Sequence, residues 1–332
     1  MRQSAALWSL LLLALSAALL LLSVAAGSQG WEWPWQMHDL GDAVQSQIVW
    51  DIRLPRSLGA WLAGALLGLA GAVAQGLFRN PLADPYLLGS ASGASLGVSV
   101  YMGAWGGSLT ATGWATRLGM TGAAFVGAVL AVLLTLALAR GVHQTLRLLL
   151  AGVVVGVVLG AITSLAALLQ PEILLAMQGF LLGSTAFVGW SGAFTMAWAL
   201  AVCMVLALIM ARVLDALTLG EATAQSLGMP LGLARVGLIA TLSLATGAAV
   251  AQTGLIAFVG LAAPHAVRSR VHTTHAGLLL LSTLMGGVLL LAADLLARTV
   301  MPAQELPVGL FTAVLGGGYL LWRMRVAPRG AA

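Results

Sequence analysis

Apolar runs recur along the whole chain and are separated by short polar segments. Most of these runs reach the ~20 residues that an α-helix needs to cross a hydrocarbon core of ~30 Å. About ten candidate spans are predicted, at residues 5–26, 57–77, 87–106, 115–139, 146–169, 189–211, 234–251, 254–266, 276–298 and 307–324. The pattern predicts an all-α polytopic membrane protein with about ten transmembrane helices.

Three of the apolar segments need separate interpretation. The run at 254–266 is too short to cross alone and is predicted to be a half-helix or re-entrant element, which is tolerated where protein or a cavity covers it. The piece from 173 to 187 is predicted to be an interfacial helix on the outer side. The run at 5–26 exceeds the ~7–15 apolar residues of a signal peptide, so it is predicted to be the first transmembrane helix, kept in the mature chain.

One polar insert, residues 213–233, is longer than the ~2–8 residues of an ordinary helix connection. Thr218 and Glu221 have the spacing of a capping box, so a short helix is predicted from there to Leu227. Gly228 is placed to end that helix in a left-handed conformation. We therefore expect two short helices outside the membrane, forming a docking surface.

Composition agrees with this class and excludes others. Hydrophobic residues make up 60% of the chain and charged residues 8%, against ~25% charge in soluble domains, and the mean hydropathy is +1.00. All fifteen basic residues are arginines. The lysine of the G-x-x-x-x-G-K-[ST] phosphate loop is therefore absent, so an ATPase driving this protein is a different chain. The arginines are spread over short loops, which does not indicate nucleic-acid binding.

The arginine distribution predicts the orientation, because cytoplasmic loops carry the excess of basic residues. With the N-terminus inside, eleven arginines fall on the inner side, namely Arg2, Arg79, Arg140, Arg147, Arg212, Arg235, Arg268, Arg270, Arg323, Arg325 and Arg329. Four fall outside, namely Arg53, Arg56, Arg117 and Arg298. Both termini are therefore predicted to be cytoplasmic, and the outer arginines are exceptions that need a reason.

Several motifs, in order along nearly the whole chain, carry a resemblance to a known family. They are Arg53-Leu54-Pro55-Arg56, Gly71-Ala72-x-x-Gln75, Arg79-Asn80-Pro81-Leu82-Ala83-x-Pro85, Leu148-Leu149-Leu150-Ala151-Gly152, Ala224-x-x-Leu227-Gly228, Gly254-x-Ile256-x-Phe258-Val259-Gly260-Leu261, Pro264-His265-x-x-Arg268, Ala293-Asp294-x-x-Ala297-Arg298 and Glu305-Leu306-Pro307-Val308-Gly309. The chain resembles the permease subunit of the ABC importers for vitamin B12, iron-siderophores and haem. Its ending departs from the family, because Gly316-Gly317-Gly318-Tyr319 stands where Gly-x-Pro and aromatic residues are usual.

The resemblance implies a single, non-catalytic permease domain over residues 1–332. It further implies a homodimer in the bacterial inner membrane, with the translocation path on its twofold axis. The other partners would be two ATP-binding ATPase subunits, which hold the ATP and magnesium, and a periplasmic substrate-binding protein. No cofactor or metal is expected on this chain. The expected cargo is an iron chelate, either haem or a ferric siderophore, with cobalamin as the alternative.

The resemblance also assigns a docking role at the outer side. Arg53, Arg56 and Arg298 match arginines that bind acidic residues on the binding protein, and an arginine can bind a carboxylate through two parallel hydrogen bonds. The alternative is that these arginines only extend to the membrane surface from helix ends, with Asp294 pairing to Arg298 one turn later.

Two further sets of residues are assigned by the resemblance at the inner side. Candidates for ATPase coupling are Glu221, Ala224, Leu227, Gly228 and Met229. Candidates for an inner gate are Asn80, Leu82, Gln144 and Thr145. For Asn80 with Pro81, a simple turn is the alternative.

Functions of other classes need residues that the chain lacks. An ion-coupled secondary transporter normally has an ionisable residue near the membrane midplane, whereas Asp294 falls near the outer end of its span. An intramembrane metalloprotease would need H-E-x-x-H, which does not occur. The histidines His265, His272 and His275 have no evident carboxylate or thiol partner in the sequence, so no metal site is predicted there.

Overall fold

The computed structural model of the protein describes residues 4–27, 30–31, 46–105, 114–139, 145–301 and 305–326. Its helices are, in chain order, α1 (Ala5–Ala25), the π-helix η2 (Ile48–Arg53), α3 (Leu54–Phe78), α4 (Ser90–Trp105), α5 (Trp114–Leu138), α6 (Thr145–Leu169), α7 (Pro171–Leu182), α8 (Trp190–Ile209), α9 (Ala211–Thr218), α10 (Glu221–Ser226), α11 (Leu231–Thr253), α12 (Val259–Arg268), α13 (His275–Thr299) and α14 (Val308–Val326). Within these ranges the only strands are β1 (Ala26–Gly27) and β2 (Gly30–Trp31), which pair antiparallel.

The predicted fold class is confirmed. Each of the ten predicted spans contains one described helix, in the expected order. Seven helices in the described part of the chain are long and apolar enough to cross a membrane: α1, α3 continuous with η2, α5, α6, α8, α11 and α13. In α14 the apolar part is shorter, Val308–Tyr319, and α4 and α12 are themselves short helices.

Helix α3 lies at the centre of the bundle and packs most closely against α13. Its residues from Ala63 onward are buried as far as Phe78. A Cβ atom at Gly64 would collide with the backbone carbonyl of Gly286, and one at Gly286 would collide with the carbonyl of Gly64. Small residues that let two backbones approach are the usual basis of helix association in membranes, and here they bring α3 and α13 together.

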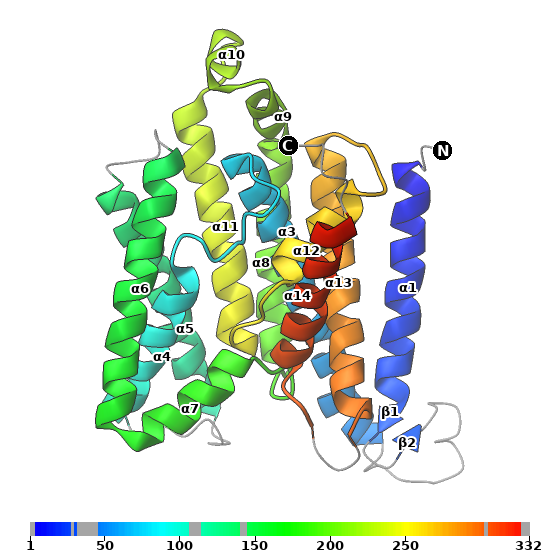
Figure 1. Ribbon diagram of the computed structural model, residues 1–332. Helices are drawn as coiled ribbons and strands as arrows, with labels where there is room; N and C mark the ends of the chain where they lie inside the picture. The colour runs from blue at the N-terminus through cyan, green and yellow to red at the C-terminus, as the bar shows by residue number, and fades with distance from the viewer. Residues whose placement is uncertain are drawn as a thin grey trace.

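The segment between α3 and α4 is irregular and shortens α4. Arg79 has a left-handed conformation (φ 49°), and Asn80 donates its N–H to the carbonyl of Gln75 over 3.1 Å, as in a Schellman helix end. Pro81 follows and cannot continue a helix. From there the chain returns toward the middle of the bundle, and α4 begins only at Ser90 (Figure 1).

Helix α12 is the half-helix that the short apolar run predicted. After α11 the chain turns at Gly254 (φ 67°) and runs back into the bundle as a non-helical segment (Figure 1). Phe258, also left-handed (φ 68°), precedes the first residue of α12. Tyr86 covers this segment by donating its hydroxyl to the carbonyl of Ile256 over 3.2 Å, so protein encloses the irregular backbone, as its position requires.

Three of the motifs that carry the family resemblance, at residues 71–75, 254–261 and 264–268, meet in space around α12. A Cβ atom at Gly71 would collide with the carbonyl of Gly260. Gln75 donates to the carbonyl of Leu261 over 3.3 Å and accepts a hydrogen bond from Arg268. These motifs are therefore one packed unit, in which α3 supports the half-helix.

The bundle has two distinct ends (Figure 1). Helices α9 and α10 lie at one of them, together with the beginning of α1 and the end of α14, and we call it the α10 end. Helix α7 lies across the opposite end, with β1 and β2, and we call that the α7 end. A helix is thus present in the segment 173–187 as α7, over Pro171–Leu182, while its place at the outer membrane interface stays a prediction.

Candidate functional site

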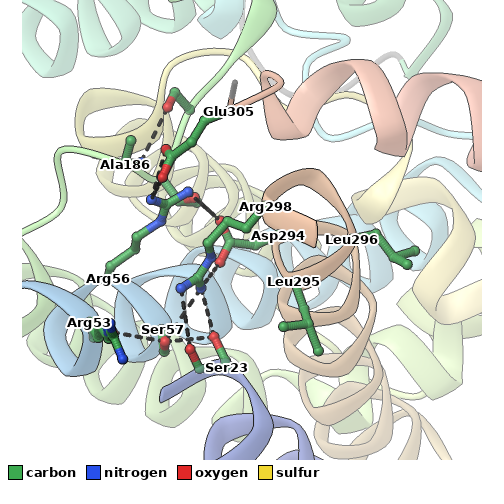
Figure 2. A network of polar contacts seen from close by, with 12 residues as sticks. Ser23, Arg53, Arg56, Ser57, Ala186, Asp294, Leu295, Leu296, Arg298 and Glu305 are labelled. Atoms are coloured by element: carbon green, nitrogen blue, oxygen red, sulfur yellow. Dashed lines mark hydrogen bonds and ion pairs between the residues drawn. The ribbon is translucent and has the colours of Figure 1, made fainter. Parts of the chain in front are cut away.

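A cluster of charged side chains lies at the α7 end, centred on Asp294 of α13. Asp294 is fully buried, with 0% of its side chain exposed. It binds Arg298 one helical turn later, accepts a hydrogen bond from the Thr185 hydroxyl, and lies 3.4 Å from Nη2 of Arg56. Figure 2 shows Arg56 reaching from α3 toward this carboxylate.

The second carboxylate of the cluster is Glu305, which precedes α14. Nη1 of Arg56 lies 2.9 Å from both Glu305 oxygens (Figure 2). Only 10% of the Arg56 side chain is exposed, against 55% of Glu305. The Asp294 cluster, defined as Arg56, Asp294, Arg298 and Glu305, therefore contains two positive and two negative groups, and Glu305 is its solvent-facing member.

Arg298 also joins the cluster to the first helix. It donates to the carbonyl of Ser23 over 3.3 Å, to the Ser23 hydroxyl over 2.6 Å and to the Ser57 hydroxyl over 3.4 Å. The two serine hydroxyls lie 2.7 Å apart. Since Ser23 belongs to α1 and Ser57 to α3, one guanidinium holds α1, α3 and α13 together.

These contacts bear on the docking role predicted for Arg53, Arg56 and Arg298. The Asp294–Arg298 pair considered as the alternative is present. The side chains of Arg56 and Arg298 are only 10% and 8% exposed, and both bind groups within this chain rather than projecting outward. Arg53 is half-buried and donates to the carbonyl of Val24 over 3.4 Å. Docking by these arginines stays a prediction, and for Arg56 and Arg298 contact with an outside carboxylate requires a change in the cluster.

At the α10 end, Glu221 joins three elements. It is the first residue of α10, and its Oε1 lies 2.6 Å from Nη2 of Arg235 in α11 and 3.6 Å from Nη2 of Arg79 after α3. Arg235 is only 5% exposed. A carboxylate at a helix N-terminus is also favourable for the helix dipole. Glu221 therefore fixes α10 to the bundle, while its predicted role in coupling stays a prediction.

The predicted capping box at the start of α10 is wrong. The residue before the helix is Gly220 (φ 100°), and no side chain caps it. Thr218 is instead the last residue of α9, where its hydroxyl donates to the carbonyl of Asp215 over 2.7 Å. Serine and threonine hydroxyls often bond to a preceding carbonyl in this way, and here that contact removes Thr218 from the cap.

The predicted end of α10 is confirmed. Gly228 is left-handed (φ 75°), its N–H donates to Gln225 over 2.9 Å, and the N–H of Met229 donates to Ala224 over 3.2 Å. These two bonds define a Schellman motif. Ala224 is fully buried beneath the helix, whereas Leu227 is 59% exposed. Of the coupling candidates, Leu227 is thus the side chain best placed to enter a partner's surface.

The inner-gate candidates are described only in part. Asn80 accepts the N–H of Leu82 through its side-chain oxygen over 2.9 Å, so the turn considered as the alternative is present. That turn presents Leu82 outward, with 56% of the residue exposed. Gln144 lies outside the described residues, and of Thr145 only the backbone, which begins α6, is described.

The histidines have separate environments. His275 does have a carboxylate partner, contrary to expectation: its Nδ1 lies 2.7 Å from Oδ1 of Asp215, which also accepts the His275 backbone N–H over 2.9 Å. The contact joins the residues 215 and 275, which sequence inspection alone does not associate. His265 packs edge-on against Tyr319, with ring centroids 5.9 Å apart. Among the residues described, no three histidine, cysteine or acidic side chains are grouped to hold a metal.

Together, the fold and these contacts define a multi-pass helical membrane protein with a charged cluster at one end and short projecting helices at the other. The sequence from residue 11 to residue 326 matches the FecCD transport family. The chain belongs to this family and is a permease of the ABC importer class.

Relatives of the chain are similar to it in sequence along nearly its full length. The chain is 38% identical over 323 residues to the vitamin B12 import system permease protein BtuC of Escherichia coli O157:H7 (strain EC4115 / EHEC), which covers 97% of this chain and 96% of that protein. It is also 38% identical over 328 residues to the BtuC protein of Shigella boydii serotype 18 (strain CDC 3083-94 / BS512), with the same coverage.

Two solved structures have a similar fold. One is described as a metal-chelate type ABC transporter in an inward-facing conformation, with a TM-score of 0.83, 28% identity, and coverage of 96% of this chain and 98% of that one. The other is PsaBC from Streptococcus pneumoniae in complex with Fab, with a TM-score of 0.59 and 16% identity, covering 87% and 94%. The second likeness concerns the fold alone.

Proposed function

We propose that two copies of this chain form the path by which an ATP-driven importer moves a large metal chelate into the cytoplasm. Cobalamin is the first candidate cargo, ahead of the iron chelates haem and ferric siderophores. The observation that carries this order is the 38% identity, over 97% of the chain, to permeases named for vitamin B12 import. It revises the sequence-based preference for an iron chelate.

The partners follow from the same proposal. Two ATPase subunits bind ATP and magnesium beneath the dimer, and a periplasmic binding protein delivers the chelate. The absence of lysine from the chain, and hence of a phosphate-binding loop lysine, supports a division of labour in which this subunit only provides the path.

For orientation, we place the α10 end in the cytoplasm and the α7 end in the periplasm of a bacterial inner membrane. The support is the excess of arginines predicted on the inner side, eleven against four. Arg79 and Arg235, which bind Glu221, belong to that inner set, and Arg56 and Arg298 to the outer set.

On this assignment the short helix α10 is the coupling element. We propose that the exposed side chain of Leu227 enters a groove on the ATPase, while Ala224 and Met229 hold the helix against its own bundle. Gly228 sets the turn that ends α10. Movement of the ATPase would then reach α11 through Glu221, whose contact with Arg235 is short and partly buried, whereas its longer, exposed contact with Arg79 is the weaker link.

We further propose that Asn80 and Leu82 narrow the path near the cytoplasm, together with Gln144 and Thr145. The exposed Leu82 on a turn held by Asn80 supports this role. An apolar, uncharged constriction would bind the cargo only weakly. Weak binding suits the release of a preassembled chelate.

The cargo assignment is tested by competition in proteoliposomes that contain this chain, its ATPase and its binding protein. Labelled cobalamin is offered alone, and then with a tenfold excess of haem or of a ferric siderophore. We expect ATP-dependent cobalamin uptake that unlabelled cobalamin suppresses and the iron compounds do not. Uptake of an iron chelate in place of cobalamin would reverse the order of candidates. A parallel sample without the binding protein is the control for passive entry.

A further inference from the structure

The two carboxylates of the Asp294 cluster are held in different ways. Asp294 has no exposed surface and contacts both arginines as well as the Thr185 hydroxyl. Glu305 is 55% exposed, and the hydrogen bonds of its carboxylate go to Arg56 alone, among the residues described. Glu305 is therefore the member of the cluster whose carboxylate can turn from its arginine toward solvent.

Departure of Glu305 leaves a charge imbalance. Arg56 would keep only an Asp294 oxygen at 3.4 Å, on a carboxylate that Arg298 also binds. Two guanidinium groups would then share one carboxylate at a site where Arg56 is 10% exposed. A buried charge deprived of its partner is strongly unfavourable, so Glu305 is expected to leave only when another carboxylate takes its place.

We propose that an acidic side chain of the substrate-binding protein replaces Glu305 on Arg56 when that protein docks at the α7 end. Glu305 is thus an internal substitute for the partner's carboxylate. A guanidinium can bind an incoming carboxylate through two hydrogen bonds, which fixes orientation as well as adding energy. This inference rests on the proposed function, because it requires an outer protein partner.

The exchange also has a consequence for α14. Glu305 is followed by Leu306, whose N–H donates to Ala297 over 3.3 Å, and then by Gly309, whose N–H donates to Gly183 over 3.5 Å. Both distances exceed the 2.9–3.0 Å typical of such bonds. The contact with Arg56 at 2.9 Å is shorter, so its loss is expected to loosen the first turn of α14.

A change at the first turn of α14 can be transmitted to the bundle through the contacts of this helix. It runs from the α7 end toward the α10 end beside α12 (Figure 1). Gly316 leaves room for the Phe258 side chain, and Tyr319 contacts the His265 ring. Docking at one end would therefore reach the half-helix through a continuous set of contacts.

The test compares the affinity of the cognate soluble binding protein for the complete transporter, reconstituted with its ATPase in nanodiscs, with and without Glu305→Gln. Glutamine keeps the shape and removes the competing charge. We expect the Kd to fall by about threefold to tenfold, the range for one partly exposed charged contact. An unchanged or higher Kd overturns the proposal. Asp51→Asn, at an exposed acid on the same end, is the matched control for general surface charge and is expected to have a smaller effect; an equal effect also overturns it.

A second measurement uses the unaltered chain, so it tests the carboxylate exchange even if the Glu305→Gln variant does not fold. Hydrogen–deuterium exchange of the segment 305–310 is followed with and without the binding protein. We expect faster exchange on docking, whereas unchanged or slower exchange contradicts the release of α14. If the unaltered transporter neither docks the binding protein nor imports, the proposed function itself fails; if it does both and these two results are negative, only the carboxylate exchange fails.

Discussion

The Glu221 carboxylate lies 2.6 Å from the guanidinium of Arg235, and this contact joins the first residue of α10 to α11. Arg235 is buried, so the pair is partly shielded from water and is stronger than an ordinary surface ion pair. The ion pair with Arg235 therefore fixes the position of α10 relative to α11.

Replacement of Arg235 is expected to separate ATP hydrolysis from transport. Arg235→Gln should destabilise the protein by about 1–2 kcal/mol, since a charged hydrogen bond is lost while Glu221 can still reach water, and it should lower uptake per ATP hydrolysed. Thermal unfolding and the ratio of uptake to hydrolysis measure the two effects. Arg79→Gln is the matched control, because its longer contact of 3.6 Å is exposed and should contribute little. Equal effects of the two variants would contradict the account.

Gly228→Val is expected to impair coupling through backbone conformation alone. A Cβ atom at Gly228 would meet no other atom within 4 Å, so the penalty comes from its φ of 75°. A left-handed conformation costs a residue with a Cβ atom roughly 1–2 kcal/mol, and a β-branched side chain is disfavoured there more strongly. Gly228→Asn is the control, since asparagine tolerates this conformation. Uptake per ATP should fall with valine and be largely kept with asparagine; the reverse order would exclude the turn as the cause.

Gly286→Ala is expected to destabilise the bundle at its centre. The added methyl group would collide with the carbonyl of Gly64 and push α13 away from α3. Overpacking of this kind costs about 1–3 kcal/mol. Gly122→Ala in α5, where a Cβ atom meets nothing within 4 Å, is the control and should keep or raise stability. Thermal unfolding in detergent distinguishes them, and similar midpoints for both variants would argue against glycine-mediated packing.

Leu82→Ala is expected to widen the inner constriction. Because Leu82 is 56% exposed, its truncation should affect folding little, and passive efflux of cargo from loaded proteoliposomes should increase. Leu130→Ala, at a similarly exposed leucine of α5, is the control for a general loss of apolar surface. An efflux rate that does not change with Leu82→Ala, or that changes equally in the control, would remove Leu82 from the gate.

The helices could be predicted because the length of an apolar run directly reflects the thickness of a bilayer. The short run at 254–266 even indicated the half-helix α12. The start of α10 was not predictable in the same way. The Thr218 hydroxyl had two local choices, a cap of α10 or a carbonyl of α9, and spacing alone does not distinguish them.

Within the candidate site, only the contacts between residues close in sequence could be predicted. The Asp294–Arg298 pair follows from i,i+4 spacing on one helix. The Arg56–Glu305 pair joins residues separated by 249 positions, one in α3 and the other in the segment before α14. A pairing that depends on tertiary packing leaves no periodic signal in the chain.

We propose that ATP hydrolysis at the α10 end drives import from the α7 end. The most direct measurement is uptake of labelled cobalamin by proteoliposomes in which the binding protein is present on one side only and ATP on one side only. We predict accumulation only when the two are on opposite sides, into the compartment that contains the ATP. Accumulation with both on the same side, or equal uptake without ATP, would contradict the account.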